Sequence, residues 1–174
     1  MTTTYYTATS LDGFIADEHD SLDWLLSQDH TGDGPLAYER FIRDIGAIVM
    51  GSTTYEWILR HHEWAYELPA WVMTTRELAT VDGADVRFAS GDVTPVHAAM
   101  TEAAGGRDLW VVGGGALAVA FADAGLLGEV VVSIAPVTLG AGAPLFPAPY
   151  DLRLLDLAQY AAFACARYEV VGPR

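Results

Sequence analysis

Three consecutive glycines, Gly113, Gly114 and Gly115, are the residues of this chain that most directly suggest chemistry. They follow a short apolar run that ends at Val112 and is typical of a buried strand. Ala116 and Leu117 then open a run with the pattern of a helix. Glycine lets a ligand approach the backbone closely, and the first turn of a helix has unpaired N–H groups that suit phosphate. The spacing predicts a pyrophosphate-binding loop, with a tight turn in the core as the alternative.

Two further strand ends have side chains that could bind an anion. The apolar run 47–50 is followed by Gly51, Ser52, Thr53 and Thr54, and one hydroxyl would cap a helix while the others remain available. The apolar run 71–73 is followed by Thr74, Thr75 and Arg76. A guanidinium at a strand end could bind a phosphomonoester through two hydrogen bonds, although a solvated loop arginine fits the pattern equally well.

The remaining pattern predicts a single α/β domain over residues 1–174. Strand-like runs alternate with helix-like runs, and no linker or repeat divides the chain. The predicted helices include 36–45, ended by Gly46, 94–104 and 116–127. Two final strands are predicted at 152–158 and 161–171.

Composition excludes several classes of function. The chain has 174 residues, 52% of them hydrophobic, and a net charge of −14; all nine basic residues are arginines. The negative charge argues against nucleic acid or an anionic membrane as partner. The absence of lysine excludes Schiff-base chemistry and Walker-type phosphate loops. The adjacent His61 and His62 have no further ligands at zinc spacing, so no metal is expected. A single cysteine and no signal peptide lead us to expect a cytoplasmic protein.

Residues 113–118 also satisfy the dinucleotide fingerprint G-x-G-x-x-G/A. That fingerprint normally follows the first strand of a Rossmann fold and is answered by an acidic residue about 20 positions later. Here the motif follows a later strand, and Glu129 stands before the next strand rather than after it. A Rossmann-type dehydrogenase is therefore a third-ranked hypothesis.

Four segments, in this order, resemble the dihydrofolate reductase-like superfamily: 10–16 (SLDGFIA), 49–56 (VMGSTTYE), 111–115 (VVGGG) and 133–146 (SIAPVTLGAGAPLF). Within it the chain is most similar to stand-alone relatives of the RibD C-terminal reductase domain. The resemblance implies a mostly parallel central sheet of about eight strands, helices on both faces, an antiparallel C-terminal strand and a homodimer. It also implies NADPH as cofactor, with the glycine loop and Gly51 to Thr54 at the pyrophosphate and Thr74, Thr75 and Arg76 at the 2′-phosphate. Ser52 stands where the family usually has arginine.

The resemblance places the substrate between the first-strand loop and the strand of Ser133. Candidate catalytic residues are Asp12, which could instead only form the Asp-Gly turn, and Asp29. Trp24, Tyr38, Tyr55 and Ser133 are candidate substrate-binding residues. Arg40, Arg43 and Arg60 are the cations available to a phosphorylated substrate.

The resulting hypothesis is an NADPH-dependent reductase of a small heterocycle, most like 5-amino-6-(5-phosphoribosylamino)uracil reductase of riboflavin biosynthesis. Two alternatives stay open: a dihydrofolate or pterin reductase, and a nucleotide-binding module of the same fold without turnover.

Overall fold

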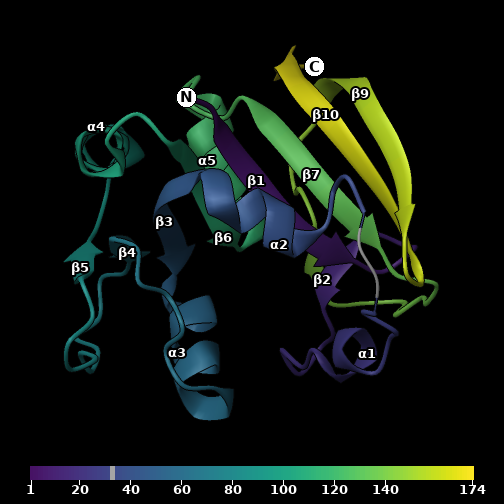
Figure 1. The fold of residues 1–174 in the computed structure, drawn as a ribbon, viewed down its shortest axis with the longest axis horizontal. Helices are drawn as coiled ribbons and strands as arrows, with labels where there is room; N and C mark the ends of the chain where they lie inside the picture. Colours follow the sequence, from purple (N-terminus) through teal and green to yellow (C-terminus); the bar gives the residue numbers. More distant parts are fainter. Residues whose placement is uncertain (32–33) are drawn as a thin grey trace.

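Eight strands form one sheet at the centre of the protein (Figure 1). The structure, a computed structural model, describes residues 1–31 and 34–174. The sheet order is β5-β4-β3-β6-β1-β7-β10-β9, and the first six of these strands run parallel. The strands are β1 (Thr3–Thr9), β3 (Ile45–Gly51), β4 (Ala70–Met73), β5 (Val86–Ala89), β6 (Asp108–Gly113), β7 (Glu129–Ile134), β9 (Tyr150–Tyr160) and β10 (Phe163–Pro173). The antiparallel pair β9–β10 closes one edge. The predicted mostly parallel α/β sheet with an antiparallel C-terminal strand is confirmed.

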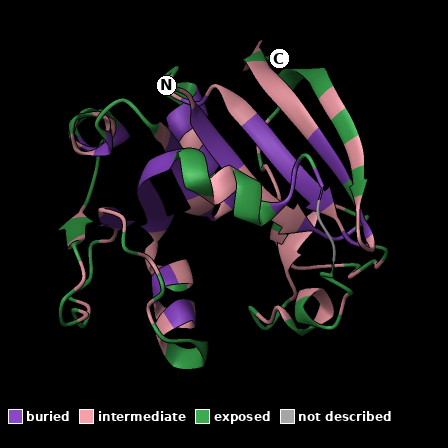
Figure 2. Ribbon diagram, in the orientation of Figure 1, coloured by how far each residue is buried: buried purple, intermediate pink, exposed green. Residues whose placement is uncertain are grey.

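Helices cover both faces of the sheet. Helices α4 (Val93–Ala104) and α5 (Gly115–Asp123) contribute to one buried cluster, which includes Met100 and Phe121. Helix α3 (Ser52–His61) contributes Tyr55 and Ile58 to the cluster on the other face. Figure 2 shows that the buried residues concentrate in the inner strands between these layers. The central strands are continuously apolar because both of their faces are covered.

The remaining elements are short. They are α1 (Asp23–Leu26), α2 (Tyr38–Phe41), the 3-10 turn η1 (Ile42–Asp44), and the two-stranded sheet of β2 (Phe14–Ala16) and β8 (Ala143–Pro144). Within the described part of the chain, no helix is long and apolar enough to cross a membrane.

The predicted helix over residues 36–45 is wrong. Only one turn of α2 and the turn η1 are helical there, and Ile45 and Gly46 already belong to β3. Gly46 is therefore not a helix C-cap. A Cβ on Gly46 would lie 2.6 Å from the carbonyl oxygen of Ala104, so glycine is needed here because α4 ends against the strand.

The glycine loop lies at the end of β6, between β3 and β1 in the sheet. A Rossmann fingerprint would instead follow the first strand of its fold. The chance match to that fingerprint therefore carries no functional meaning, and the Rossmann-type alternative is excluded.

Candidate active site

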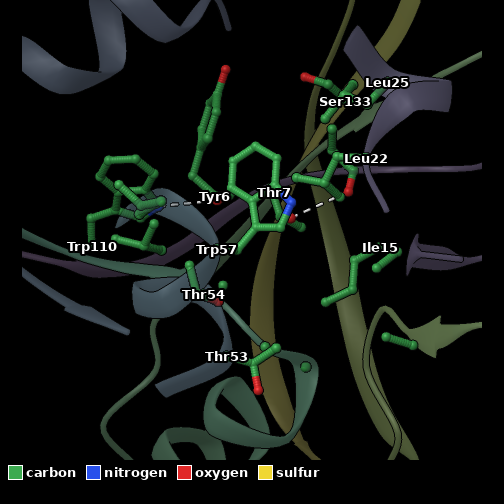
Figure 3. A pocket seen from close by; sticks show the side chains of 18 of the residues that line it. Tyr6, Thr7, Ile15, Leu22, Leu25, Thr53, Thr54, Trp57, Trp110 and Ser133 are labelled. Atoms are coloured by element: carbon green, nitrogen blue, oxygen red, sulfur yellow. Dashed lines mark hydrogen bonds between the residues drawn. The ribbon is translucent and has the colours of Figure 1, made fainter. Parts of the chain in front are cut away.

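A cleft of about 680 Å³ opens where the central parallel strands end (Figure 3). Parallel strands bring their carboxyl ends to one edge of the sheet, and ligands of open α/β sheets bind there. Helix α3 begins directly after β3, and α5 begins after β6, which lies beside β3. Two helix N-termini therefore lie next to each other at this edge.

Both helix starts are built to leave backbone N–H groups accessible. Neither α3 nor α5 has a side-chain hydrogen bond to its first turn. The cleft is lined at this end by the residues of the two starts and the strand before α5: Thr53, Thr54, Val112, Gly113, Gly114, Gly115 and Ala116. Uncapped N–H groups at two adjacent helix starts suit the two phosphates of a pyrophosphate.

The three glycines serve different physical needs. Gly114 has φ +88°, a conformation that favours glycine. A Cβ on Gly113 would lie 2.9 Å from Thr54 Oγ1, and one on Gly115 would lie 2.5 Å from the carbonyl oxygens of Pro144 and Leu145. The glycines thus let the α5 start, the α3 start and the segment after β7 approach one another closely around the cleft.

Aromatic side chains form one wall of the cleft. They are Tyr6, Tyr38, Trp57, Tyr66 and Trp110. The wall is held together by ring contacts and by two hydrogen bonds: Trp110 Nε1 donates to the Tyr6 carbonyl (3.0 Å), and the Tyr6 hydroxyl donates to the Leu36 carbonyl (3.1 Å). Burial raises the pKa of both Tyr6 and Tyr66, so these phenols remain neutral at physiological pH.

The opposite wall is aliphatic. In Figure 3, Trp110 and Tyr6 stand on one side of the view, and Ile15, Leu22 and Leu25 on the other. Ser133, from β7, brings a hydroxyl to this wall, and its Oγ lies 3.5 Å from the buried Cys165 Sγ. A flat ring can therefore be enclosed between an aromatic and an aliphatic surface, with a hydroxyl at its edge.

The predicted phosphate-binding residues separate into two groups. The seven that line the cleft are named above. Gly51, Ser52, Thr74, Thr75, Arg76 and Leu117 do not line it. Arg76 instead binds the Glu56 carboxylate through two hydrogen bonds of 3.2 and 2.6 Å, and Thr74 Oγ1 accepts the Arg76 backbone N–H. Because β4 pairs with β3, this group lies beside the α3 start.

The predicted substrate-binding residues separate in the same way. Tyr38 and Ser133 line the cleft. Tyr55 is fully buried and donates its hydroxyl to the Ala79 carbonyl at 2.7 Å. Trp24 packs against a buried cluster that contains Leu36 and Phe163.

The structure brings neither predicted catalytic carboxylate to the cleft lining. Asp12 accepts hydrogen bonds from Ser10 Oγ and from the backbone N–H groups of Leu139 and Gly140, and these lower its pKa to about 2. Asp29 accepts both the side-chain and the backbone hydrogen bond of Thr31. Asp12 thus joins the turn after β1 to the loop after β7, which agrees with the turn alternative. Among the described residues, no three His, Cys, Asp or Glu side chains group as a metal site.

Sequence reasoning missed most of the aromatic wall. Tyr6, Trp57, Tyr66 and Trp110 were not proposed, because aromatic residues in apolar runs are usually core. A usable signal existed for Trp57: it follows Thr53 by one helical turn, so it had to lie on the same side of α3.

Comparison with known proteins identifies the family. The model of the RibD C-terminal domain matches residues 59–166. The chain belongs to the RibD C-terminal domain family. Its fold is similar to a putative riboflavin biosynthesis protein from Shewanella sp. PV-4, with a TM-score of 0.82, 25% identity, and coverage of 98% of this chain and 99% of that one.

Two further relatives have the same extent. A pyrimidine reductase-like protein from Corynebacterium diphtheriae has a TM-score of 0.68 at 14% identity and shares the fold over 98% of this chain and 92% of its own. The uncharacterized protein YwjB of Bacillus subtilis is 29% identical over 145 residues, 83% of this chain and 82% of that protein. Both alignments cover more than four fifths of each chain.

Proposed function

We propose that this chain is an NADPH-dependent reductase of a small heterocyclic substrate. Its membership of the RibD C-terminal domain family supports a reductase of the riboflavin-pathway type. The observation that carries the proposal is a cleft in which two uncapped helix starts adjoin a wall of aromatic rings. A pyrophosphate fits the first feature, and flat rings fit the second.

The residues present fit the cofactor. The N–H groups at the starts of α3 and α5, with the hydroxyls of Thr53 and Thr54, would hold the pyrophosphate. Arg76, beside the α3 start, is placed to contact a 2′-phosphate. When bound, NADPH supplies the hydride. The chain itself would orient the rings between its two walls and exclude water from them.

The hydroxyls of Ser133 and Tyr38 are the polar groups of the ring end that we assign to substrate binding. They are neutral donors and acceptors, so they can orient the edge of a heterocycle without charging the cleft. Asp12 has a structural role in this proposal, because its carboxylate already accepts hydrogen bonds from Leu139, Gly140 and Ser10.

Tryptophan fluorescence provides the test, because Trp57 and Trp110 line the cleft. NADPH should quench it saturably at micromolar concentrations. The loaded protein is then offered dihydrofolate, other pterins and 5-amino-6-(5-phosphoribosylamino)uracil, while NADPH absorbance is followed. Oxidation with any of them supports a reductase. Binding without oxidation across the panel favours a nucleotide-binding module, and no binding contradicts the proposal.

We also propose that the chain forms a homodimer through β9. This edge strand exposes Leu152, Leu154 and Leu157 at 41, 54 and 68% of their surface. Apolar residues along an unpaired edge are typical of an interface. Analytical ultracentrifugation should find a dimer that Leu154→Asp converts to a monomer; a monomeric wild-type protein contradicts this.

A further inference from the structure

The ring end of the cleft carries negative charge and no arginine. Asp20 and Glu39, which are both exposed, line the cleft. His30 also lines it, and its Nε2 lies 3.0 Å from the carbonyl oxygen of Leu25. No arginine of the described residues is among those that line it. The three arginines that the sequence offered to a phosphorylated substrate, Arg40, Arg43 and Arg60, are all outside the lining.

Several arginines have side-chain partners elsewhere in the protein. Arg87, Arg153 and Arg167 form ion pairs with Asp85, Glu169 and Glu129, respectively. Arg60 Nε donates to the backbone carbonyl of Glu56 on its own helix. Arg76 pairs with Glu56, beside the α3 start and not at the aromatic wall. These arginines, as arranged, do not supply a guanidinium to the ring end.

A phosphate group therefore has one place to bind in this cleft, the pair of helix starts. In the proposed function these N–H groups hold the cofactor pyrophosphate. A second phosphate, on the substrate, would carry a charge of about −1.5 to −2 and would face Asp20 and Glu39 in a protein of net charge −14. Removing such a group from water without a cation to pair it is strongly unfavourable.

The aromatic wall favours a ligand that is flat and either neutral or positively charged. The faces of tryptophan and tyrosine rings attract flat rings and cations, and Tyr6, Tyr38, Tyr66 and Trp110 are packed together on one wall. The carboxylates at the opening add to this preference. The available polar groups, among them the Ser133 hydroxyl, suit the neutral edge of a heterocycle.

We propose that the substrate is an unphosphorylated, flat heterocycle of neutral or positive charge, bound between the aromatic wall and Ile15, Leu22 and Leu25. This inference rests on the proposed function, because it assigns the helix starts to the cofactor. The chain would thus differ in its substrate from a reductase of phosphoribosylated pyrimidines, while the hydride transfer would be the same.

Matched ligand pairs that differ only in a phosphate test this inference. The protein is saturated with NADP⁺, which occupies the cofactor site without turnover, and binding of riboflavin against FMN and of guanosine against GMP is measured by equilibrium dialysis. We expect the unphosphorylated member of at least one pair to bind ten-fold or more tightly than its partner. Equal or tighter binding of the phosphorylated members, or no binding by any of the four, would overturn the inference.

Charge variants show whether the discrimination comes from the cleft. The double variant Glu39→Gln/Asp20→Asn should reduce the ratio of the two dissociation constants several-fold. The double variant Asp82→Asn/Glu102→Gln, which removes two exposed carboxylates outside the lining, should leave that ratio unchanged. If both changes reduced this ratio equally, the preference for unphosphorylated ligands would come from the net charge of the protein, and its assignment to the ring end of the cleft would be overturned. Failure of NADP⁺ itself to bind is a separate result, which rejects the proposed function.

Discussion

The ion pair between Arg76 and Glu56 should decide how strongly the protein prefers NADPH to NADH. The guanidinium binds the carboxylate through two hydrogen bonds, and both side chains are partly exposed, at 53 and 35%. Thr74 Oγ1 holds the Arg76 backbone, which fixes the arginine beside the first turns of α3. In our proposal the 2′-phosphate of NADPH takes hydrogen bonds from this guanidinium, and NADH has no such group.

The expected magnitudes follow from the exposure of the pair. A hydrogen bond to a charged group contributes about 1.5–3 kcal/mol, and the lower end applies to an exposed site. At 1.4 kcal/mol per ten-fold change, Arg76→Ala should weaken NADPH binding roughly ten-fold and leave NADH binding unchanged. Glu56→Gln releases the arginine from an exposed ion pair worth about 0.2–1 kcal/mol, so NADPH affinity should rise about 1.4- to 5-fold.

Quenching of tryptophan fluorescence by NADPH and by NADH measures both affinities. Arg87→Ala is a matched control, because Arg87 forms a similar two-bond pair with Asp85 at another strand. It should alter neither affinity. If Arg76→Ala weakened NADPH and NADH equally, or left both unchanged, the assignment of Arg76 to the 2′-phosphate would be refuted.

Three further variants test the architecture of the site. Thr54→Val keeps the shape of the side chain at the α3 start but removes its hydroxyl. The loss of a hydrogen bond worth about 0.5–1.5 kcal/mol should weaken the binding of NADPH and of NADH by the same factor, roughly 2- to 12-fold. A change in the ratio of the two affinities would contradict the assignment of Thr54 to the pyrophosphate. Gly115→Ala places a Cβ against two backbone carbonyls. Calorimetry should therefore find that the free energy of unfolding falls by about 1–3 kcal/mol and the melting temperature by roughly 2–12 °C. Gly172→Ala, at an open position of β10, is the control, and an equal fall in the melting temperatures of both variants would reject the packing argument. Asp12→Asn should lower the melting temperature at neutral pH, because the folded state depresses the pKa of Asp12 to about 2. This stabilisation is present above the unfolded pKa of about 3.9 and is lost as pH falls through 2. A difference between the two melting temperatures that persisted undiminished at pH 2 would show that the Asp12 charge is not its source.

Much of the sheet could be predicted from the sequence because the central strands are buried on both faces. The apolar runs in β3, β6 and β7 are continuous, which is the pattern of a parallel sheet between helices. Helix α4 was predicted over residues 94–104 and is found at Val93–Ala104, and Gly105 ends it with φ +60°. The prediction for residues 36–45 was wrong because their apolar spacing fits a helix and Gly46 fits a helix end. The contact that requires glycine at position 46, with Ala104, is a long-range one that local sequence does not show.

The end of the cleft formed by the two helix starts, which we propose binds the cofactor, could be located from the sequence because its residues are contiguous at those starts. Most of the aromatic wall could not be predicted, because Tyr6 and Trp110 meet only through the order β3-β6-β1 in the sheet. The hydrogen-bond partners of Asp12 could not be predicted from the local sequence either. Its partners Leu139 and Gly140 lie 127 and 128 positions away, and no spacing rule connects them.

The most direct test of the account is a crystal structure of the protein with NADP⁺ bound. We predict that the pyrophosphate lies on the N–H groups at the starts of α3 and α5, with the 2′-phosphate at Arg76 and the nicotinamide ring toward the aromatic wall of Tyr6 and Trp110. A dinucleotide bound elsewhere, or one whose pyrophosphate does not contact the two helix starts, would contradict the account.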